Sequence, residues 1–148
     1  MRLCCYRRSL PLPYLDTIPG GMRQGKNIVV KVTIKPNPTS FQINLQCGMC
    51  NNPRSDIAFH FNPRFNEQAI SMNTLRDTKW DATDQRHGTN FPFHPNGAYE
   101  IMFQCEQHQF KVALNGSHLL DFKHRLPFQN ISALAVDGDC VVTEINYQ

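Results

Sequence analysis

The sequence has no long apolar run, and no stretch approaches the roughly 20 residues that a membrane-spanning helix needs. It also lacks an excess of one charge, because 15 Lys and Arg stand against 12 Asp and Glu and are scattered along the chain. We therefore expect neither membrane insertion nor nucleic-acid binding, which requires a basic patch. With 41% hydrophobic and 18% charged residues in 148, the composition is typical of one ordinary globular domain.

Sequence signals for catalysis are equally scarce. A hydrolase needs a positioned nucleophile with its base, or two carboxylates that flank a glycosidic bond. The sequence contains no G-x-S-x-G motif. We therefore expect a protein that is not an enzyme and that uses no cofactor.

The six cysteines do not have the compact spacing of a disulfide-rich fold. They lie as an adjacent pair, Cys4 and Cys5, as a C-x-x-C pair, Cys47 and Cys50, and singly at Cys105 and Cys140. A structural zinc site needs four ligands, and no second C-x-x-C or close histidine pair follows, so we expect no metal site. The N-terminal residues also lack the apolar region of a signal peptide. These patterns favour reduced thiols and a cytoplasmic location.

Residues 1–13 are expected to form a short irregular arm, because Pro11 and Pro13 oppose helix and the Arg7-Arg8 pair favours solvent. From Tyr14 onward, short alternating runs separated by turn residues predict an antiparallel sandwich or barrel without a long helix. The expected strands include 27–35, 41–47, 100–105, 110–115, 119–123, 132–137 and 140–147. The Asn115-Gly116 dipeptide predicts a tight hairpin turn.

The most informative stretch runs from Asp56 to Asn73. In a regular strand, Ile57, Phe59 and Phe61 would share one face. The opposite face would carry His60, Asn62 and Arg64. Such a row combines imidazole, carboxamide and guanidinium, a set of donors and acceptors that suits hydroxyl groups better than phosphate or metal. The row therefore predicts a sugar as ligand.

Two further residues extend this predicted site. Asn73 falls on the same face by alternation, and Trp80, the single tryptophan, is followed by polar, turn-like residues that favour exposure. An exposed indole is a flat apolar surface on which the C–H face of galactose can stack while the sugar hydroxyls reach the polar row.

These motifs resemble the carbohydrate-recognition signature of the galectin family. The resemblance is carried by His60-Phe61-Asn62-Pro63-Arg64-Phe65, then Asn73, then Trp80 followed by an acid and Arg86. It extends to Ile18-Pro19-Gly20-Gly21, Phe91-Pro92-Phe93, Phe110-Lys111-Val112 and His124-Arg125-Leu126-Pro127. The resemblance covers residues 14–148 and implies an all-β, jelly-roll β-sandwich of two antiparallel sheets, of the galectin or concanavalin kind.

The resemblance also implies a role for each site residue. His60, Asn62 and Arg64 would bond the axial 4-hydroxyl and the ring-side oxygens of galactose. Asn73 and an acid would take the 6-hydroxyl, and Trp80 would stack beneath the ring. Arg86 and the acid would reach the next sugar and hold Arg64 through charge-assisted bonds. Sugars with an equatorial 4-hydroxyl, such as glucose, would leave His60 and Arg64 unpaired.

One stretch departs from the family pattern. The family has Trp-Gly-x-Glu-x-Arg, whereas this chain has Trp80-Asp81-Ala82-Thr83-Asp84-Gln85-Arg86. With a one-residue insertion, Asp84 and Arg86 fill the acid and arginine positions. Without it, Thr83 and Gln85 fill them and both charges vanish. We favour the insertion because it restores the chemistry, although the shorter aspartate predicts weakened or shifted lactose binding.

Two functions are compatible with the sequence. The first is a lectin for β-galactosides of the lactose or N-acetyllactosamine type on glycoproteins or glycolipids, with Ser40, Gln42 and Asn44 extending the groove to longer glycans. The alternative is a galectin-fold protein-interaction module whose sugar site has drifted. The resemblance implies release from the cytoplasm without a signal peptide. It also permits a homodimer through terminal strands, which the arm of residues 1–13 could support or block.

Overall fold

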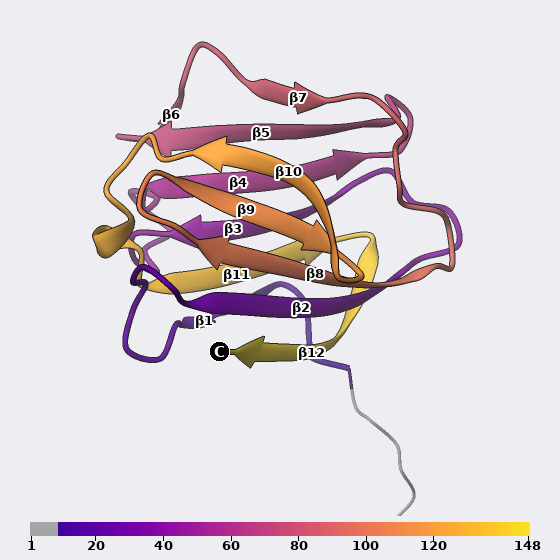
Figure 1. Cartoon of the computed structure of the whole chain (residues 1–148), viewed down its shortest axis with the longest axis horizontal. Coiled ribbons are helices and arrows are strands. Elements are labelled where there is room, and N and C mark those ends of the chain that lie inside the picture. Colours follow the sequence, from indigo (N-terminus) through magenta and orange to yellow (C-terminus); the bar gives the residue numbers. More distant parts are fainter. Residues whose placement is uncertain (1–8) are drawn as a thin grey trace, which may run out of the picture.

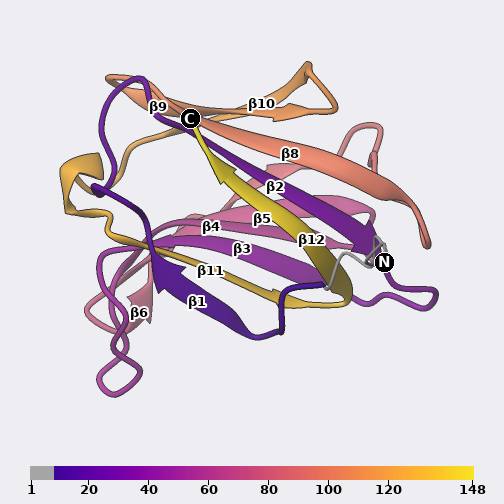
Figure 2. The ribbon, with the colours of Figure 1, turned by 90° about the horizontal axis from the view of Figure 1, so that it is seen from below.

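The computed structural model describes residues 9–148 and contains two antiparallel β-sheets that face one another (Figures 1 and 2). One sheet contains β1 (Tyr14–Thr17), β3 (Phe41–Gln46), β4 (Ile57–Arg64), β5 (Ala69–Arg76), β6 (Lys79–Trp80), β7 (Gln85–His87) and β11 (Ala133–Gly138). The other contains β2 (Asn27–Ile34), β8 (Ala98–Cys105), β9 (Gln109–Leu114), β10 (Ser117–Lys123) and β12 (Cys140–Tyr147). A 3₁₀ helix, η1 (Phe128–Asn130), precedes β11.

Within the described residues, the seven-stranded sheet has the order β1-β11-β3-β4-β5-β6, and β7 also pairs with β5. The five-stranded sheet has the order β10-β9-β8-β2-β12. The predicted class, all-β with two antiparallel sheets, is confirmed. The Asn115-Gly116 turn is confirmed too, since both residues have positive φ and Leu114 pairs with Ser117. The sequence analysis did not predict β1, β6 and β7, which are only two to four residues long.

Alternation along the strands places the apolar faces of the two sheets against each other. Phe59 of β4 stacks on Phe122 of β10 with 4.4 Å between ring centroids, and it meets Phe103 of β8 edge-on at 5.8 Å. All three rings are buried. Burial of each such side chain contributes about 1.5–3 kcal/mol. This aromatic contact fixes β4, and therefore fixes the residues on its opposite face.

β4 departs from regular alternation at its start. Leu45 of β3 pairs with Phe59, but the next residue, Gln46, pairs with Ile57, so Ala58 is the extra residue of a β-bulge. Directly opposed residues point to the same face, and Ile57 therefore lies on the face of Gln46, while Ala58 joins the core. The prediction that Ile57 shares the face of Phe59 is wrong, because strand periodicity cannot foresee a bulge.

Residues 9–13 lie at the edge of the sandwich. The Leu10 N–H donates to the Val142 carbonyl of β12 at 2.9 Å, and Leu10 and Leu12 pack against the core. Leu10 thus occupies part of the edge at which a second copy could add a strand. The homodimer and the division between an arm at 1–13 and a domain at 14–148 stay predictions. The residues Cys4, Cys5, Arg7 and Arg8 lie outside the described part of the chain.

No helix within residues 9–148 is both long and apolar enough to cross a membrane.

A close approach between β11 and β3 depends on Gly138. Its φ is +107°, and a Cβ at this position would lie 2.6 Å from the Cα of Phe41. The next residue, Asp139, accepts a hydrogen bond from the Thr39 N–H at 2.8 Å. Together these contacts hold the start of β3 against β11.

Gly138→Ala is expected to lower the free energy of unfolding by more than about 2 kcal/mol, because left-handed strain adds to a backbone clash with Phe41. Gly25→Ala is the matched control, since Gly25 has a φ of +91° but nothing within 4 Å of its added Cβ. Urea denaturation of both variants measures the difference. Equal losses of stability in the two variants would contradict a role for the close approach.

Candidate functional site

The polar row predicted from the sequence lies on the outer face of the seven-stranded sheet. His60 pairs with Asn44 of β3 and with Asn73 of β5, and Asn62 pairs with Ser71 of β5. Asn44, His60 and Asn73 therefore form a line across three strands. Neighbouring side chains cover most of this row, so that His60 is only 7% exposed. The row is a pre-formed polar surface rather than a set of mobile side chains.

His60 is held as a neutral imidazole. Its Nδ1 lies 2.6 Å from the Asn44 Oδ1. Burial, and then the nearby positive charges of Arg54 and Arg64, lower the pKa of His60 to about 4. Because an amide oxygen only accepts, the Nδ1 carries the proton and the Nε2 is left as an acceptor. A hydroxyl group is a suitable donor to that nitrogen.

Arg64 is oriented by contacts on both sides of its guanidinium. Its Nε donates to the Asn62 Oδ1 at 2.9 Å, and its Nη1 donates to the Glu67 Oε2 at 3.3 Å. Asn62 is in turn fixed by donation from its Nδ2 to the Phe41 carbonyl at 2.7 Å. The remaining donors of this guanidinium can bond a ligand without further ordering of the side chain.

Glu67 joins the two arginines of the site, and the sequence analysis missed it. Its carboxylate accepts from Arg64 and also from the Arg86 Nη1. The hydrogen bond from Arg86, followed by that from Arg64, lowers the pKa of Glu67 below its usual range. The sequence analysis expected the acid after Trp80 to hold Arg64, whereas this contact comes from Glu67. The one available signal was the i,i+3 spacing of Arg64 and Glu67 across a turn.

The loop after Trp80 brings Asp84 and Arg86 to the row. The Arg86 Nε donates to the Asp84 Oδ2 at 2.9 Å, and this bond lowers the pKa of Asp84. The Ser71 hydroxyl lies 3.4 Å from the same oxygen. The Gln85 side chain is directed away from the row and toward the five-stranded sheet, because its Nε2 donates to the Asp121 carbonyl of β10 at 2.8 Å. Asp84 and Arg86 therefore lie together beside the polar row, whereas the Gln85 side chain is directed to the other sheet.

The amide of Asn73 already has three partners. Its Nδ2 donates to the Asp81 carbonyl at 3.1 Å, and its Oδ1 accepts from the Thr74 N–H at 2.7 Å and from the Arg125 Nη1 at 3.0 Å. A carboxamide has two donor hydrogens, so one N–H of Asn73 is left for a ligand. Arg125 was not among the predicted site residues, although it stands in one of the motifs that carry the family resemblance.

Trp80 is exposed, as the sequence analysis expected. Its side chain is 43% exposed, and its ring lies 4.6 Å from the His60 ring and 5.9 Å from the Arg54 guanidinium carbon. An open hollow of about 280 Å³ lies beside it. The residues that line this hollow are His60, Arg64, Ser71, Asn73, Trp80, Ala82 and Asp84. The hollow is thus bordered by the flat apolar indole and by polar side chains of the row, and it is large enough to hold a sugar ring.

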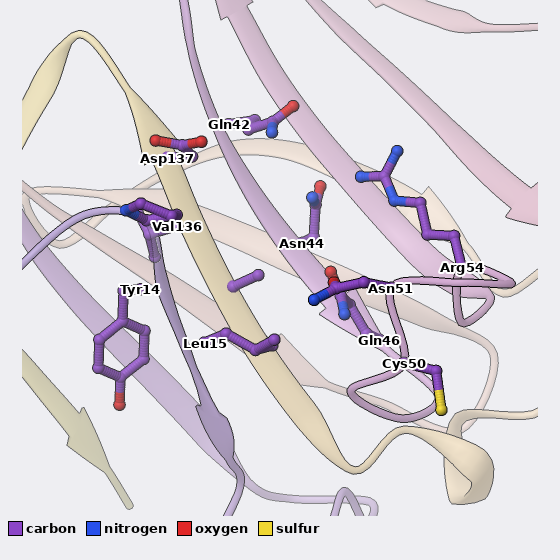
Figure 3. Close-up of a pocket in the computed structure, with 12 residues that line it drawn as sticks. Tyr14, Leu15, Gln42, Asn44, Gln46, Cys50, Asn51, Arg54, Val136 and Asp137 are labelled. Carbon is purple, nitrogen blue, oxygen red and sulfur yellow. The ribbon is translucent and has the colours of Figure 1, made fainter.

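A second hollow, of about 320 Å³, continues along the same face of the sheet. Figure 3 shows the amides of Gln42, Asn44 and Gln46 between Asp137 on one side and Arg54 on the other. Asn44 connects the two hollows through its contact with His60. Ser40, the third residue predicted to extend the groove, instead lies in a backbone bridge with Arg64 outside the lining of this hollow.

The cysteines of the described residues are free thiols. Cys105 and Cys140 are buried, and burial raises the pKa of Cys105 to about 11. Cys50 is exposed and Cys47 is half-buried. In residues 9–148, no group of three or more histidine, cysteine or acidic side chains is arranged to hold a metal ion.

The sequence matches the profile of a family described as Galactoside-binding lectin over residues 13–147. Among curated proteins, it is similar to Galectin-4 of Homo sapiens and Galectin-8 of Rattus norvegicus, with 35% and 36% identity over 137 residues, or 92% of this chain. The chain spans about two fifths of the length of these relatives, 41% and 42%.

Solved structures agree with the sequence matches. Sheep Galectin-11, solved in complex with glycerol, superposes with a TM-score of 0.82 and 27% identity over 95% of this chain and 100% of its own. The Caenorhabditis elegans galectin LEC-6 gives a TM-score of 0.83 at 24% identity, over 95% of this chain and 93% of its own, and supports the fold alone. The galectin fold implied by the sequence is confirmed, and with the profile match over 13–147 the chain belongs to the galectin family of galactoside-binding lectins.

Proposed function

We propose that the protein binds β-galactosides of the lactose and N-acetyllactosamine type in the hollow that His60, Arg64 and Trp80 line. The observation that carries the proposal is a neutral imidazole with an acceptor Nε2 beside a fixed guanidinium and an exposed indole. The family is one of lectins and not of enzymes. Galactose-terminated glycans on glycoproteins or glycolipids are the proposed partners.

The axial 4-hydroxyl of galactose is the group that the row fits best. This hydroxyl can donate to the His60 Nε2 and accept from Arg64, while the C–H face of the ring stacks on Trp80. Asn62 is not among the residues that line the hollow, and we propose that it acts on the sugar by holding Arg64 in position. An equatorial 4-hydroxyl would leave the imidazole and the guanidinium desolvated without a partner, and this cost selects against glucose.

The other site residues have secondary roles in the proposal. The remaining N–H of Asn73 would donate to the 6-hydroxyl of galactose. Asp84 and Arg86, paired at 2.9 Å, would contact the second sugar of a disaccharide. Longer glycans would run past Asn44 toward Gln42, and Ser40 would contribute only at the far end of the groove.

We also propose that the protein is cytoplasmic and leaves the cell without a signal peptide, as the family implies. The free thiols at Cys105 and Cys140 support a reducing compartment.

Trp80→Ala is expected to weaken lactose binding at least about tenfold, or ~1.4 kcal/mol, because the stacking surface is lost. Arg64→Ala should weaken it at least as much, since a charge-assisted bond disappears. Isothermal titration calorimetry measures both. Met49→Ala is the control, because Met49 is an apolar side chain with a similar exposure, 44% against 43% for Trp80. If the unmodified protein bound no galactoside on a glycan array, the proposal would fail, and the divergent loop at 80–86 would favour the interaction module.

The affinity for lactose is expected to stay constant from pH 8 to pH 5.5 and to fall as the pH approaches 4. Protonation of the His60 Nε2 removes the acceptor, and the pKa of His60 is lowered to about 4. The same shift makes the free energy of unfolding fall as the pH drops from about 6.5 toward 4, since the unfolded histidine binds its proton first.

Asn44→Asp is the matched variant for this pH dependence. A carboxylate on the Nδ1 would favour the charged imidazole and raise the pKa of His60, so the loss of lactose binding should move to higher pH. Calorimetric titrations at pH 7.5, 6, 5 and 4 test both proteins. A loss of affinity between pH 7 and pH 6 in the unmodified protein would contradict a neutral, buried His60.

A further inference from the structure

The loop that follows Trp80 is attached to the opposite sheet. In the alignment that we favour, residues 81–84 of this loop contain one residue more than the family pattern. On the side of the seven-stranded sheet, the Asp81 N–H donates to the Thr74 carbonyl of β5 at 3.0 Å. At the far end of the loop, Gln85 pairs with Met72 of β5 through its backbone, while its side-chain Nε2 donates to the Asp121 carbonyl of β10 in the other sheet at 2.8 Å.

Asp81 is the charged anchor of this loop. Its carboxylate accepts two bonds from Arg76, Nε to Oδ1 at 2.9 Å and Nη2 to Oδ2 at 3.0 Å. These bonds with Arg76 are the largest cause of the lowered pKa of Asp81. A bidentate pair of this kind fixes the direction of both side chains. Asp81 is the direct neighbour of Trp80, so its position bears on that of the indole.

Arg125 contacts this anchor from the segment after β10. Its Nη1 lies 3.6 Å from the Asp81 Oδ2, and it donates to the Thr83 carbonyl at 2.7 Å and to the Asn73 Oδ1 at 3.0 Å. Its guanidinium also lies over the Phe122 ring at 5.1 Å. One terminal nitrogen therefore touches β5 and two points of the loop, while the same side chain packs on the other sheet.

The contact with Asn73 settles the orientation of an amide that lines the sugar hollow. With Arg125 and the Thr74 N–H on its oxygen, the amide nitrogen must face the Asp81 carbonyl and the hollow. Without Arg125, the amide would lose one of the two donors that distinguish its oxygen from its nitrogen, and the loop would lose its bond at Thr83.

We propose that Arg125 is a positioning residue for the carbohydrate site: it holds loop 81–84 and the Asn73 amide, and through them the Trp80 indole and Asp84. The inference rests on the proposed lectin function. Arg125 reaches the sugar only through other residues, since it is not among those that line the hollow.

Fluorescence tests the positioning without any sugar, because Trp80 is the single tryptophan of the chain. In Arg125→Gln, the acrylamide quenching constant of Trp80 is expected to rise by up to about twofold, since the indole is 43% exposed and a released loop would uncover more of it. Arg125→Lys keeps the charge near Asp81 and should give an intermediate value. Lys123→Gln removes an exposed cation from β10 and is the matched control, with no expected change.

Calorimetry of the same variants tests the consequence for binding. Arg125→Gln should weaken lactose binding about tenfold, with Arg125→Lys between it and the unmodified protein. Asp81→Asn, which alters the same contacts from the loop side, should also raise the quenching constant. The proposal is overturned if Arg125→Gln lowers the thermal midpoint but leaves both the quenching constant and the lactose affinity unchanged. If the unmodified protein binds no galactoside, the proposed function fails while the quenching result still decides the role of Arg125.

Discussion

The packing of β4 against the opposite sheet is the constraint on which the site depends. Phe59 stacks on Phe122 and meets Phe103, so the core side of the strand cannot rotate or slip. A shift of one residue would exchange the two faces and bury the polar row instead. The aromatic core therefore does more than stabilise the sandwich. It determines that His60 and Asn62 point outward.

The outer face is ordered by a second set of interactions, which are polar. The Asn44 amide sets the proton position on His60, and Asn62 and Glu67 fix the Arg64 guanidinium. In the proposed function, ligand binding costs little side-chain entropy, because the groups proposed to meet the sugar are already in place. A shallow, open site needs this order, since it buries less of its ligand than an enclosed pocket would.

The two sheets cooperate in forming the site. β4 and β5 supply the row, but the loop after Trp80 is tied to β10 through Gln85 and to the following segment through Arg125. The backbone of Trp80 thus pairs with β5 of the seven-stranded sheet. The loop that follows Trp80 is held by contacts with β10 of the five-stranded sheet and with Arg125. The position of the loop beside the proposed site is therefore set by contacts between residues distant in sequence, and not by the strand that carries Trp80.

The sequence by itself determined the all-β class, the longer strands, the polar row and the exposed tryptophan, because each follows from period-two alternation or from residue type. It also supplied the motifs that carry the family resemblance. Only the tertiary structure decided the bulge at Ala58, the link from Glu67 to Arg64 and Arg86, the outward position of Asp84 and the reach of Arg125 into the loop. The bulge depends on strand register, and the contacts of Arg86 with Glu67 and of Arg125 with Thr83 join residues that are distant in sequence, so local periodicity carries no information about them. The contact of Glu67 with Arg64 is local, but residue spacing alone does not say which partner a surface carboxylate takes.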